Sequence, residues 1–477
     1  MNRETKLIKN TFILGIGNVI PKLSSFIVLP ILTGHLSKSE YGAYDLILVL
    51  AALLLPAVTL QLQTAAFRFL IDEKNNFENQ KKIVTNIFSY ILPVTLFIII
   101  ILFFILSKYT YILRLLIGIY FLFDLLRAAV GQIARGLGYN KIYALGSVVS
   151  STIELICTLL LIYYFDMGLI GVLICLCLSN SLATIYMSFK VKLFKYLNLK
   201  LVDKKELKKL IHYSWPMVPN SLSMWVMNAS DRLVLTFFLG LEASATYAVA
   251  KKLPNVLTIL QNTFTMAWQE SASLASKDLD SASYYSKMFD IIFSIMAGLM
   301  MLLSASMPLL FKILIHGNYD EAYMQIPIIL ISMFFFSIAS YLGGIYIAQK
   351  KTKNVGITTF VAAIINFLTC IIMVNSCGVY AASISTLISY LVLMIFRMID
   401  INKYIKIEYN FKRIVPIVAS LILVTFISFN RNMIFNIFNI ILSIILTVLI
   451  NKKIIVELFK YVKKKLNRKG NNEKREK

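Results

Sequence analysis

Fourteen apolar stretches, each near the length that an α-helix needs to cross a bilayer, divide almost the whole chain. Such a helix takes about 20 mostly apolar residues, because the bilayer interior has no water for a free backbone group. Of the 477 residues, 58% are hydrophobic, so a soluble domain is excluded. The sequence therefore predicts an all-α, polytopic membrane bundle of about 14 transmembrane helices. The expected spans are 10–32, 42–65, 83–106, 113–133, 142–164, 168–188, 214–239, 246–270, 288–314, 324–348, 355–375, 378–397, 414–429 and 433–451.

The basic residues indicate which side of the membrane each connection faces. With the N-terminus in the cytoplasm, 38 of the 48 Lys and Arg residues fall in inner segments, five in outer turns and five within spans. This bias follows the positive-inside rule, so we expect both termini in the cytoplasm. It also accounts for the net charge of +24, and we expect no nucleic-acid partner.

The outer connections are all short, and the longest are residues 33–41 and 315–323. None of them has room for an external domain. The three histidines, His35, His212 and His316, lie in or beside loops. A membrane enzyme such as a polymerase or an acyltransferase is disfavoured, because those chemistries need a sizeable outer loop or a histidine within the membrane.

The longest inner connection, residues 189–213, divides the chain and is rich in lysine. Within it, Asp203 followed by Glu206 predicts a capping box. Three apolar residues then share one helical face, opposite several lysines, and they are Leu207, Leu210 and Ile211. This pattern predicts an amphipathic helix on the inner leaflet. The alternative is a solvated basic linker.

The two halves of the chain resemble each other. Gly34-His-Leu-Ser-Lys-Ser-Glu-Tyr41 aligns with Gly240-Leu-Glu-Ala-Ser-Ala-Thr-Tyr247 at an offset of 206, and Glu154 falls on Asn366 at an offset of 212. A duplicated six-span unit gives two parallel repeats, because six is an even number of crossings. The expected organisation is a lobe in 1–188, the linker 189–213, a second lobe in 214–398, two further helices in 399–451 and a basic cytoplasmic tail in 452–477.

Five cations lie inside the predicted spans, where a charge costs several kcal/mol unless it faces the bundle interior or a wet cavity. They are Lys22, Arg127, Arg232, Lys251 and Lys252. Arg and Lys bind phosphate strongly where water is excluded, so these residues predict a cavity for an anionic substrate. For Arg232 the alternative is a side chain that extends to the outer interface.

The other polar residues within spans have both structural and functional interpretations. Asp124 and Arg127 are three residues apart and can pair on one helix, or Arg127 can add to the cationic cavity. Glu154 has no local partner, so it is expected either to carry a proton or to bond to another helix. Asp231 is expected to orient a neighbour, and Asn366 is the repeat counterpart of Glu154. We name these residues as candidates for ion coupling or gating.

Short motifs along the chain share the order and spacing of a known family. They are Leu36-Ser-Lys-Ser-Glu-Tyr41-Gly42-Ala-Tyr44, Gly168-Leu-Ile-Gly171, Asp231-Arg232-Leu-Val-Leu, Leu239-Gly240, Tyr247-Ala-Val-Ala-Lys-Lys-Leu253 and the span around Asn366. Over residues 8–400 the chain resembles polysaccharide flippases of the Wzx type, in the multidrug/oligosaccharidyl-lipid/polysaccharide exporter superfamily. It departs from them at His35, where Arg or Tyr is frequent, and at Glu154, where the repeat copy has Asn.

This resemblance implies a V-shaped bundle of two lobes that works by alternating access, as a transporter and not as an enzyme. The implied substrate is a polyprenyl-pyrophosphate-linked oligosaccharide, moved from the inner to the outer leaflet of the bacterial cytoplasmic membrane. Its product would feed O-antigen, capsule or another surface polysaccharide. Coupling to H⁺ or Na⁺ and transport driven by the membrane potential are both left open. Membrane lipids, glycosyltransferases and a polymerase are the other candidate partners. We expect no cofactor and no metal site.

Two other transporters remain as alternatives. A cation-coupled multidrug exporter of the same superfamily would favour acidic residues in its cavity, whereas the intramembrane charges here are mostly basic. A lipid II flippase would share the anionic substrate chemistry.

Overall fold

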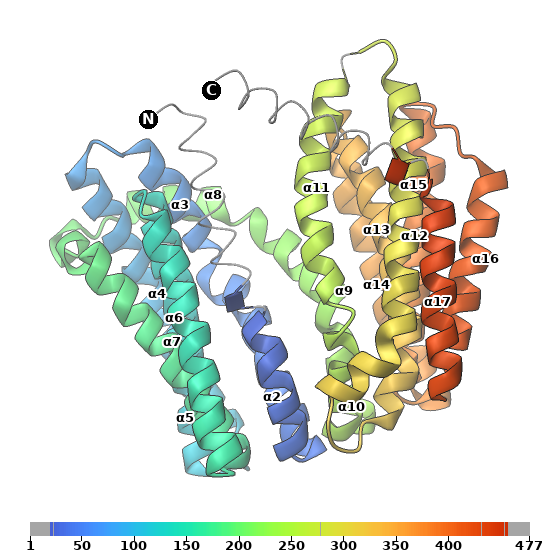
Figure 1. Ribbon diagram of the computed structural model, residues 1–477. Coiled ribbons are helices and arrows are strands. Elements are labelled where there is room, and N and C mark those ends of the chain that lie inside the picture. Colours follow the sequence, from blue (N-terminus) through green and yellow to red (C-terminus); the bar gives the residue numbers. More distant parts are fainter. Residues whose placement is uncertain (1–19, 22, 277, 431, 453, 457–477) are drawn as a thin grey trace, which may run out of the picture. The chain divides into compact units, whose positions relative to one another are not determined.

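Helices form nearly all of the protein, and the computed structural model describes residues 20–21, 23–276, 278–430, 432–452 and 454–456 (Figure 1). Within these ranges no residue lies in a β-strand. The prediction of an all-α bundle is confirmed.

The chain divides into two compact units, which are Met1–Thr246 with Leu314–Asn318, and Tyr247–Ile313 with Tyr319–Lys477. The first unit contains the helix Leu23–His35, α2(Lys38–Thr59), α3(Leu62–Asp72), α4(Phe77–Ile105), α5(Tyr111–Gly136), α6(Asn140–Thr158), the π-helical η1(Leu159–Tyr164), α7(Gly168–Val191), η2(Leu193–Tyr196), η3(Leu199–Leu201), α8(Lys204–Ser214) and α9(Met217–Leu239). The division falls within α10(Leu241–Lys252). The second unit then contains α11(Val256–Ala275), α12(Ser281–Leu314), α13(Asp320–Ala348), α14(Thr352–Cys377), α15(Tyr380–Asp400), η4(Ile401–Lys403), α16(Phe411–Ile427) and α17(Met433–Ile450). The final residue of α12, Leu314, is assigned to the first unit.

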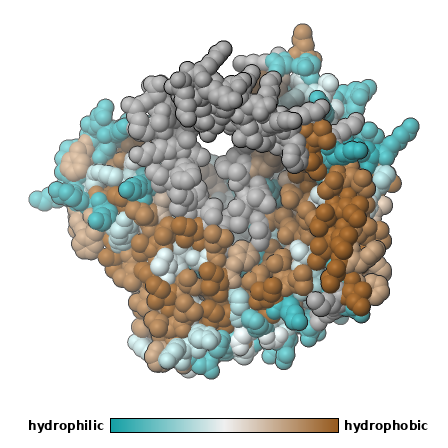
Figure 2. Space-filling model, in the orientation of Figure 1, coloured by the Kyte–Doolittle hydropathy of each residue, from teal (hydrophilic) through white to brown (hydrophobic). Residues whose placement is uncertain are grey.

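Most of the predicted spans correspond to continuous helix in the part of the chain that the structure describes, but the span predicted over 246–270 is divided between α10 and α11 by turn residues 253–255. Eight of these helices are long and apolar enough to cross a membrane, namely α2, α4, α6 with η1, α7, α12, α13, α14 and α15 with η4. The helix Leu23–His35 and most of α17 are shorter apolar helices. On the face drawn in Figure 2, hydrophobic side chains cover the middle of the helices and hydrophilic ones gather toward their ends. This distribution is the one that a bilayer requires.

The second predicted span is broken within its length, although its sequence predicts one continuous helix. Leu60 and Gln61, between α2 and α3, have left-handed backbone with φ of 47° and 59°. Such a conformation costs a residue with a side chain about 1–2 kcal/mol, and it is concentrated at functional sites. The hydroxyl of Thr59 accepts a hydrogen bond from the Gln61 amide at 3.3 Å and so satisfies part of the break.

A capping box at the start of α2 explains the first half of the Leu36–Tyr44 motif. The Ser37 hydroxyl accepts from the Glu40 amide at 3.2 Å, and the Glu40 carboxylate accepts from the Ser37 amide at 3.0 Å. The other oxygen of Glu40 accepts from the Leu169 amide at 3.1 Å, at the start of α7. A carboxylate is favoured there, because the first amides of a helix have no partner within the helix and carry positive partial charge.

Two glycines allow this corner to close. Gly168 has φ of +55°, and a Cβ atom there would lie 2.4 Å from the Glu40 carboxylate. A Cβ atom on Gly42 would lie 2.1 Å from the carbonyl oxygen of Leu241. The motif residues Ser37, Glu40, Gly42 and Gly168 therefore hold the N-terminal ends of α2, α7 and α10 together.

The second unit is built around α13, whose residues are buried along most of its length. Arg397 of α15 is only 3% exposed and donates to the Ala339 carbonyl at 2.7 Å and to the Thr358 hydroxyl at 3.0 Å. It ties α15 to α13 and α14, so it is a packed residue although the sequence placed it at the start of an inner loop.

The last two helices attach to the rest of the second unit by polar contacts. Thr447 of α17 donates to the Gly298 carbonyl of α12 at 3.3 Å, and Asn451 donates to the Ser294 carbonyl at 3.2 Å. Gly298 permits the close approach, because a Cβ atom there would lie 2.7 Å from the Thr447 methyl group. Small residues and hydroxyls of this kind are the usual means by which helices associate in lipid.

We predict that Gly168→Ala lowers the stability of the protein more than Gly138→Ala does. Both glycines have positive φ, but no atom lies within 4 Å of a Cβ at Gly138. The control should cost about 1 kcal/mol for its backbone alone. Gly168→Ala should also lose the hydrogen bond that the Leu169 amide donates to the Glu40 carboxylate, which adds about 1.5–3 kcal/mol. Thermal unfolding of the purified protein in detergent measures both, and equal shifts would contradict this account of the corner.

Candidate functional site: the α2–α9 seam and a polar cavity

Helix α2 presents three different sides within the first unit. Tyr44 and Leu48, one turn apart, line a polar cavity. Leu46 and Leu50 line an apolar slot of about 200 Å³. The third side contacts α9 through Asp45. The line of contact between α2 and α9, together with the break after α2, is called the α2–α9 seam below.

An ion pair lies in this seam, toward the N-terminal end of α2. The Nη1 atom of Arg232 is 3.1 Å from both carboxylate oxygens of Asp45. The Asp45 side chain is 1% exposed and that of Arg232 is 15% exposed. Because both groups are removed from water, each depends on the other, and removal of one partner leaves a buried charge without compensation.

Two further hydrogen bonds continue the seam toward the break in α2. The indole of Trp225 donates to the Val49 carbonyl at 2.9 Å. The side-chain amide of Gln61, at the break itself, donates to the Ser221 hydroxyl at 2.9 Å. Helix α9 therefore follows α2 over roughly three turns, between Ser221 and Arg232.

Asp231 does not share the environment of its neighbour. It is fully buried in α9 and has interaction partners of its own. The carbonyl of Arg232 accepts from the hydroxyls of Thr236 and Ser244 at 2.7 and 3.3 Å. Hydroxyls from α9 and from α10 thus fix the backbone beside the ion pair.

A polar cavity of about 420 Å³ lies inside the first unit and contains three of the predicted residues. Asp124 and Arg127 of α5 form the expected pair, with Nη2 and Oδ1 3.3 Å apart, and Glu154 of α6 faces the same space. Two carboxylates for one guanidinium give the cavity an excess of acidic groups. Its other polar walls include Tyr120, Tyr143, Ser147, Ser151 and Asn180. In the described part of the chain, no three His, Cys, Asp or Glu side chains are grouped so as to hold a metal ion.

The remaining candidates belong to the second unit or lie outside the described residues. Lys251 is 4% exposed, and its ammonium lies 5.3 Å from the centre of the Tyr247 ring. Lys252 is half-buried, and Asn366 is fully buried in α14. All three have interaction partners. Lys22 falls outside the residues that the structure describes.

Comparison with known proteins adds to this geometry. The family model described as "Polysaccharide biosynthesis protein" matches residues 7–269, more than half of the chain. The chain belongs to this family. No curated protein sequence gives a significant match.

Solved structures with the same fold include two transporters. A lipid II flippase MurJ in an inward closed conformation is 14% identical with a TM-score of 0.69, over 93% of this chain and 99% of that one. An inward-facing MATE family multidrug resistance transporter of the MOP superfamily is 14% identical with a TM-score of 0.67, over 82% of this chain and 98% of that one. At this identity the likeness shows the fold, which is that of a multi-pass membrane transporter.

Asp45, the partner of Arg232 in this member of the polysaccharide biosynthesis family, was not among the residues predicted from the sequence. Asp45 stands four residues after Tyr41, inside the second predicted span, and an intramembrane carboxylate is itself a signal. The internal repeat provides a second signal, because the offset of 206 that aligns Tyr41 with Tyr247 also aligns Asp45 with Lys251. Both copies of the repeat thus carry a charge at this position.

The buried ion pair gives a direct prediction for stability. Asp45→Asn and Arg232→Gln should each destabilise the protein by about 3 kcal/mol, whereas the double variant should lose much less than the sum. Thermal unfolding in detergent provides the measurement. The exposed pair Arg68–Asp72, 2.8 Å apart, is the matched control, and its neutralisation should cost less than about 1 kcal/mol. Simple additivity at Asp45 and Arg232 would refute the pairing.

Proposed function

We propose that this protein is a flippase that moves a polyprenyl-pyrophosphate-linked oligosaccharide from the inner to the outer leaflet of the bacterial cytoplasmic membrane. The oligosaccharide would serve O-antigen, capsule or another surface polysaccharide. Glycosyltransferases would build it and a polymerase would consume it. The family description, the fold shared with a lipid II flippase and the cations within the spans support this proposal.

The observation that carries the proposal is the Asp45–Arg232 pair. A guanidinium in a dry environment binds phosphate through two parallel hydrogen bonds. In the absence of substrate, the Asp45 carboxylate keeps this guanidinium compensated. In the proposed cycle, the substrate pyrophosphate takes the place of Asp45, and α9 is then released from α2. Binding of the anion and opening of the seam are thereby the same event.

The direction of transport agrees with the charge of the substrate. The lipid tail stays in the bilayer while the sugars and the pyrophosphate cross through polar surroundings. An inside-negative potential favours outward movement of each negative charge by about 2.3 kcal/mol per 100 mV. In this proposal both termini are cytoplasmic, the lobes 1–188 and 214–398 alternate around the substrate, and Lys22, Lys251 and Lys252 add to the attraction for the pyrophosphate.

The polar cavity of the first unit supports a second part of the proposal, which is coupling to H⁺ or Na⁺. Glu154 and Asp124 outnumber Arg127 there, so the cavity favours a small cation. In this scheme a cation neutralises Glu154 during one half of the cycle, and Asp231 and Asn366 transmit or gate the change. An acidic cavity would also suit a cation-coupled multidrug exporter, but the buried cation on the seam favours the anionic substrate.

The double variant Asp45→Asn/Arg232→Gln tests the substrate assignment. It should fold but restore less than about a tenth of the surface polysaccharide when it complements a deletion strain, because no guanidinium remains to bind the pyrophosphate. Protein level in the membrane is measured alongside, and neutralised Arg68–Asp72 is the control. Full complementation by the double variant would sink the proposed role of Arg232.

Glu154→Gln tests the coupling role separately. Flipping in proteoliposomes should lose its dependence on an imposed H⁺ or Na⁺ gradient, because a neutral amide neither binds nor releases the cation. Glu73→Gln, which removes a half-buried carboxylate of the same unit that does not line the cavity, should behave as the unmodified protein does. If gradient dependence persists in Glu154→Gln, the coupling site is elsewhere, and the flippase assignment is unaffected.

A further inference from the structure

The basic linker between α7 and α9 is held against α4 by hydrogen bonds. Thr85 and Asn86 are buried in α4, and their side chains bond to the linker backbone. Their partners are the carbonyl of Tyr196 at 3.1 Å, the amide of Asn198 at 3.0 Å, the carbonyl of Leu201 at 3.1 Å and the amide of Asp203 at 2.8 Å. The path of the linker up to α8 is therefore fixed by the first unit.

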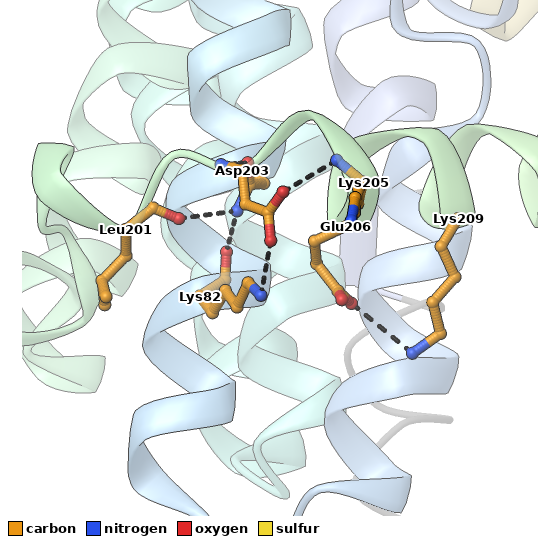
Figure 3. Close-up of polar contacts among 7 residues, drawn as sticks. Lys82, Leu201, Asp203, Lys205, Glu206 and Lys209 are labelled. Carbon is orange, nitrogen blue, oxygen red and sulfur yellow. Dashed lines mark hydrogen bonds and ion pairs between the residues drawn. The ribbon is translucent and has the colours of Figure 1, made fainter.

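The N-terminus of α8 is held at the same place. The Asp203 carboxylate accepts from the Lys205 amide at 2.8 Å and lies 2.7 Å from the Lys82 ammonium of α4 (Figure 3). Its hydrogen bond from Lys82 holds the pKa of Asp203 below its usual value. Asp203 is the N-cap of α8. Its own amide donates to Asn86, and the Glu206 carboxylate pairs with the Lys209 ammonium at 3.6 Å (Figure 3).

The apolar face of α8 is covered by protein. Leu210 is fully buried, and Leu207 and Ile211 pack against the same cluster, which includes residues of α3 and α4. The sequence suggested that this face lies on the inner leaflet. Since α3 and α4 occupy it, the helix has only its opposite side to present to the membrane.

That opposite side carries lysines and an exposed indole. Lys205, Lys208, His212 and Trp215 follow at spacings of three and four residues, so they share one side of the helix, and with Lys209 and Ile211 they line a groove of about 490 Å³. Trp215 is 54% exposed. Among the described residues, neither Lys205 nor Lys208 has an ion-pair partner. We call Lys205, Lys208, His212 and Trp215 the α8 stripe.

Exposed apolar side chains precede the stripe along the chain. Phe194 is 67% exposed, Leu199 is 85% exposed, and Val202 is also exposed. Lysines alternate with them at Lys195 and Lys200. Exposure of the apolar side chains to water is unfavourable. At the boundary between headgroups and acyl chains, the apolar side chains can contact acyl chains while the lysines contact headgroups.

We propose that the α8 stripe binds the phosphate of anionic phospholipids in the inner leaflet. Lys205 and Lys208 supply ammonium groups that have no carboxylate to satisfy them, and the Trp215 indole lies at the level of the headgroups, where this residue is enriched in membrane proteins. Lysine clusters beside a membrane span attract anionic lipids in this way. The linker would thus hold the first unit to the charged surface of the inner leaflet, independently of the transported substrate.

Trp215 provides a reporter at the stripe itself. The full-length protein in mixed micelles is titrated with brominated phosphatidylglycerol or brominated phosphatidylcholine, and the fluorescence quenching that Trp215→Phe removes is assigned to the stripe. Phosphatidylglycerol should quench at the lower concentration. Lys205→Gln/Lys208→Gln should weaken its binding on the order of tenfold, since each lysine contributes to the attraction. Lys205→Arg/Lys208→Arg should retain it.

A matched control removes the same charge from another inner connection. Lys350→Gln/Lys353→Gln, in the exposed turn before and into α14, should leave the Trp215 signal unchanged. Equal quenching by the two lipids, or equal weakening by the control, would overturn the proposal. Displacement of phosphatidylglycerol by equimolar inorganic pyrophosphate would also overturn it and assign the stripe to the headgroup of the transported lipid. The unfolding temperature of each variant confirms that the exposed substitutions leave the fold intact.

Discussion

The rest of this structure depends on the absence of water inside a bilayer, which obliges each polar group there to find a partner within the protein. The break between α2 and α3 shows the rule at the backbone, where the Thr59 hydroxyl accepts from the Gln61 backbone amide. The Gln61 side chain in turn donates to the Ser221 hydroxyl of α9. Arg397 shows it at a side chain, since carbonyls and hydroxyls surround a guanidinium that water cannot reach. The buried polar residues described above therefore connect helices to one another.

A buried charge can be stabilised by groups that are fixed in place or by a single group that a ligand can replace. The first arrangement suits a residue that packs helices together, and the second suits a residue that binds a ligand. Arg397 is enclosed by neutral groups of α13 and α14, which no ligand could replace without unpacking the unit. Arg232 has a single carboxylate on a neighbouring helix, beside a break in that helix. An incoming anion can substitute for one carboxylate, so the second arrangement is suited to a transport cycle.

Much of the fold was predictable from the sequence, because a helix that crosses the membrane requires a long apolar stretch. The positions of the helices follow from them, and the Leu36–Tyr44 motif marked a corner whose physical role is now explained by Ser37, Glu40 and Gly168. The Asp45–Arg232 pair was not predictable in the same way, because it joins residues 187 apart. The α8 helix was anticipated, but its covered face was not, since an amphipathic pattern does not reveal whether protein or lipid meets the apolar side.

The polar contacts that attach α17 to α12 have a consequence for biosynthesis. The α16–α17 hairpin follows the Ser294 and Gly298 carbonyls, to which Asn451 and Thr447 donate, by more than a hundred residues. Because lipid offers no alternative partner to these amide and hydroxyl groups, α17 is stable in the bilayer only when α12 is already in place. The order of synthesis therefore matches the order in which these partners are needed.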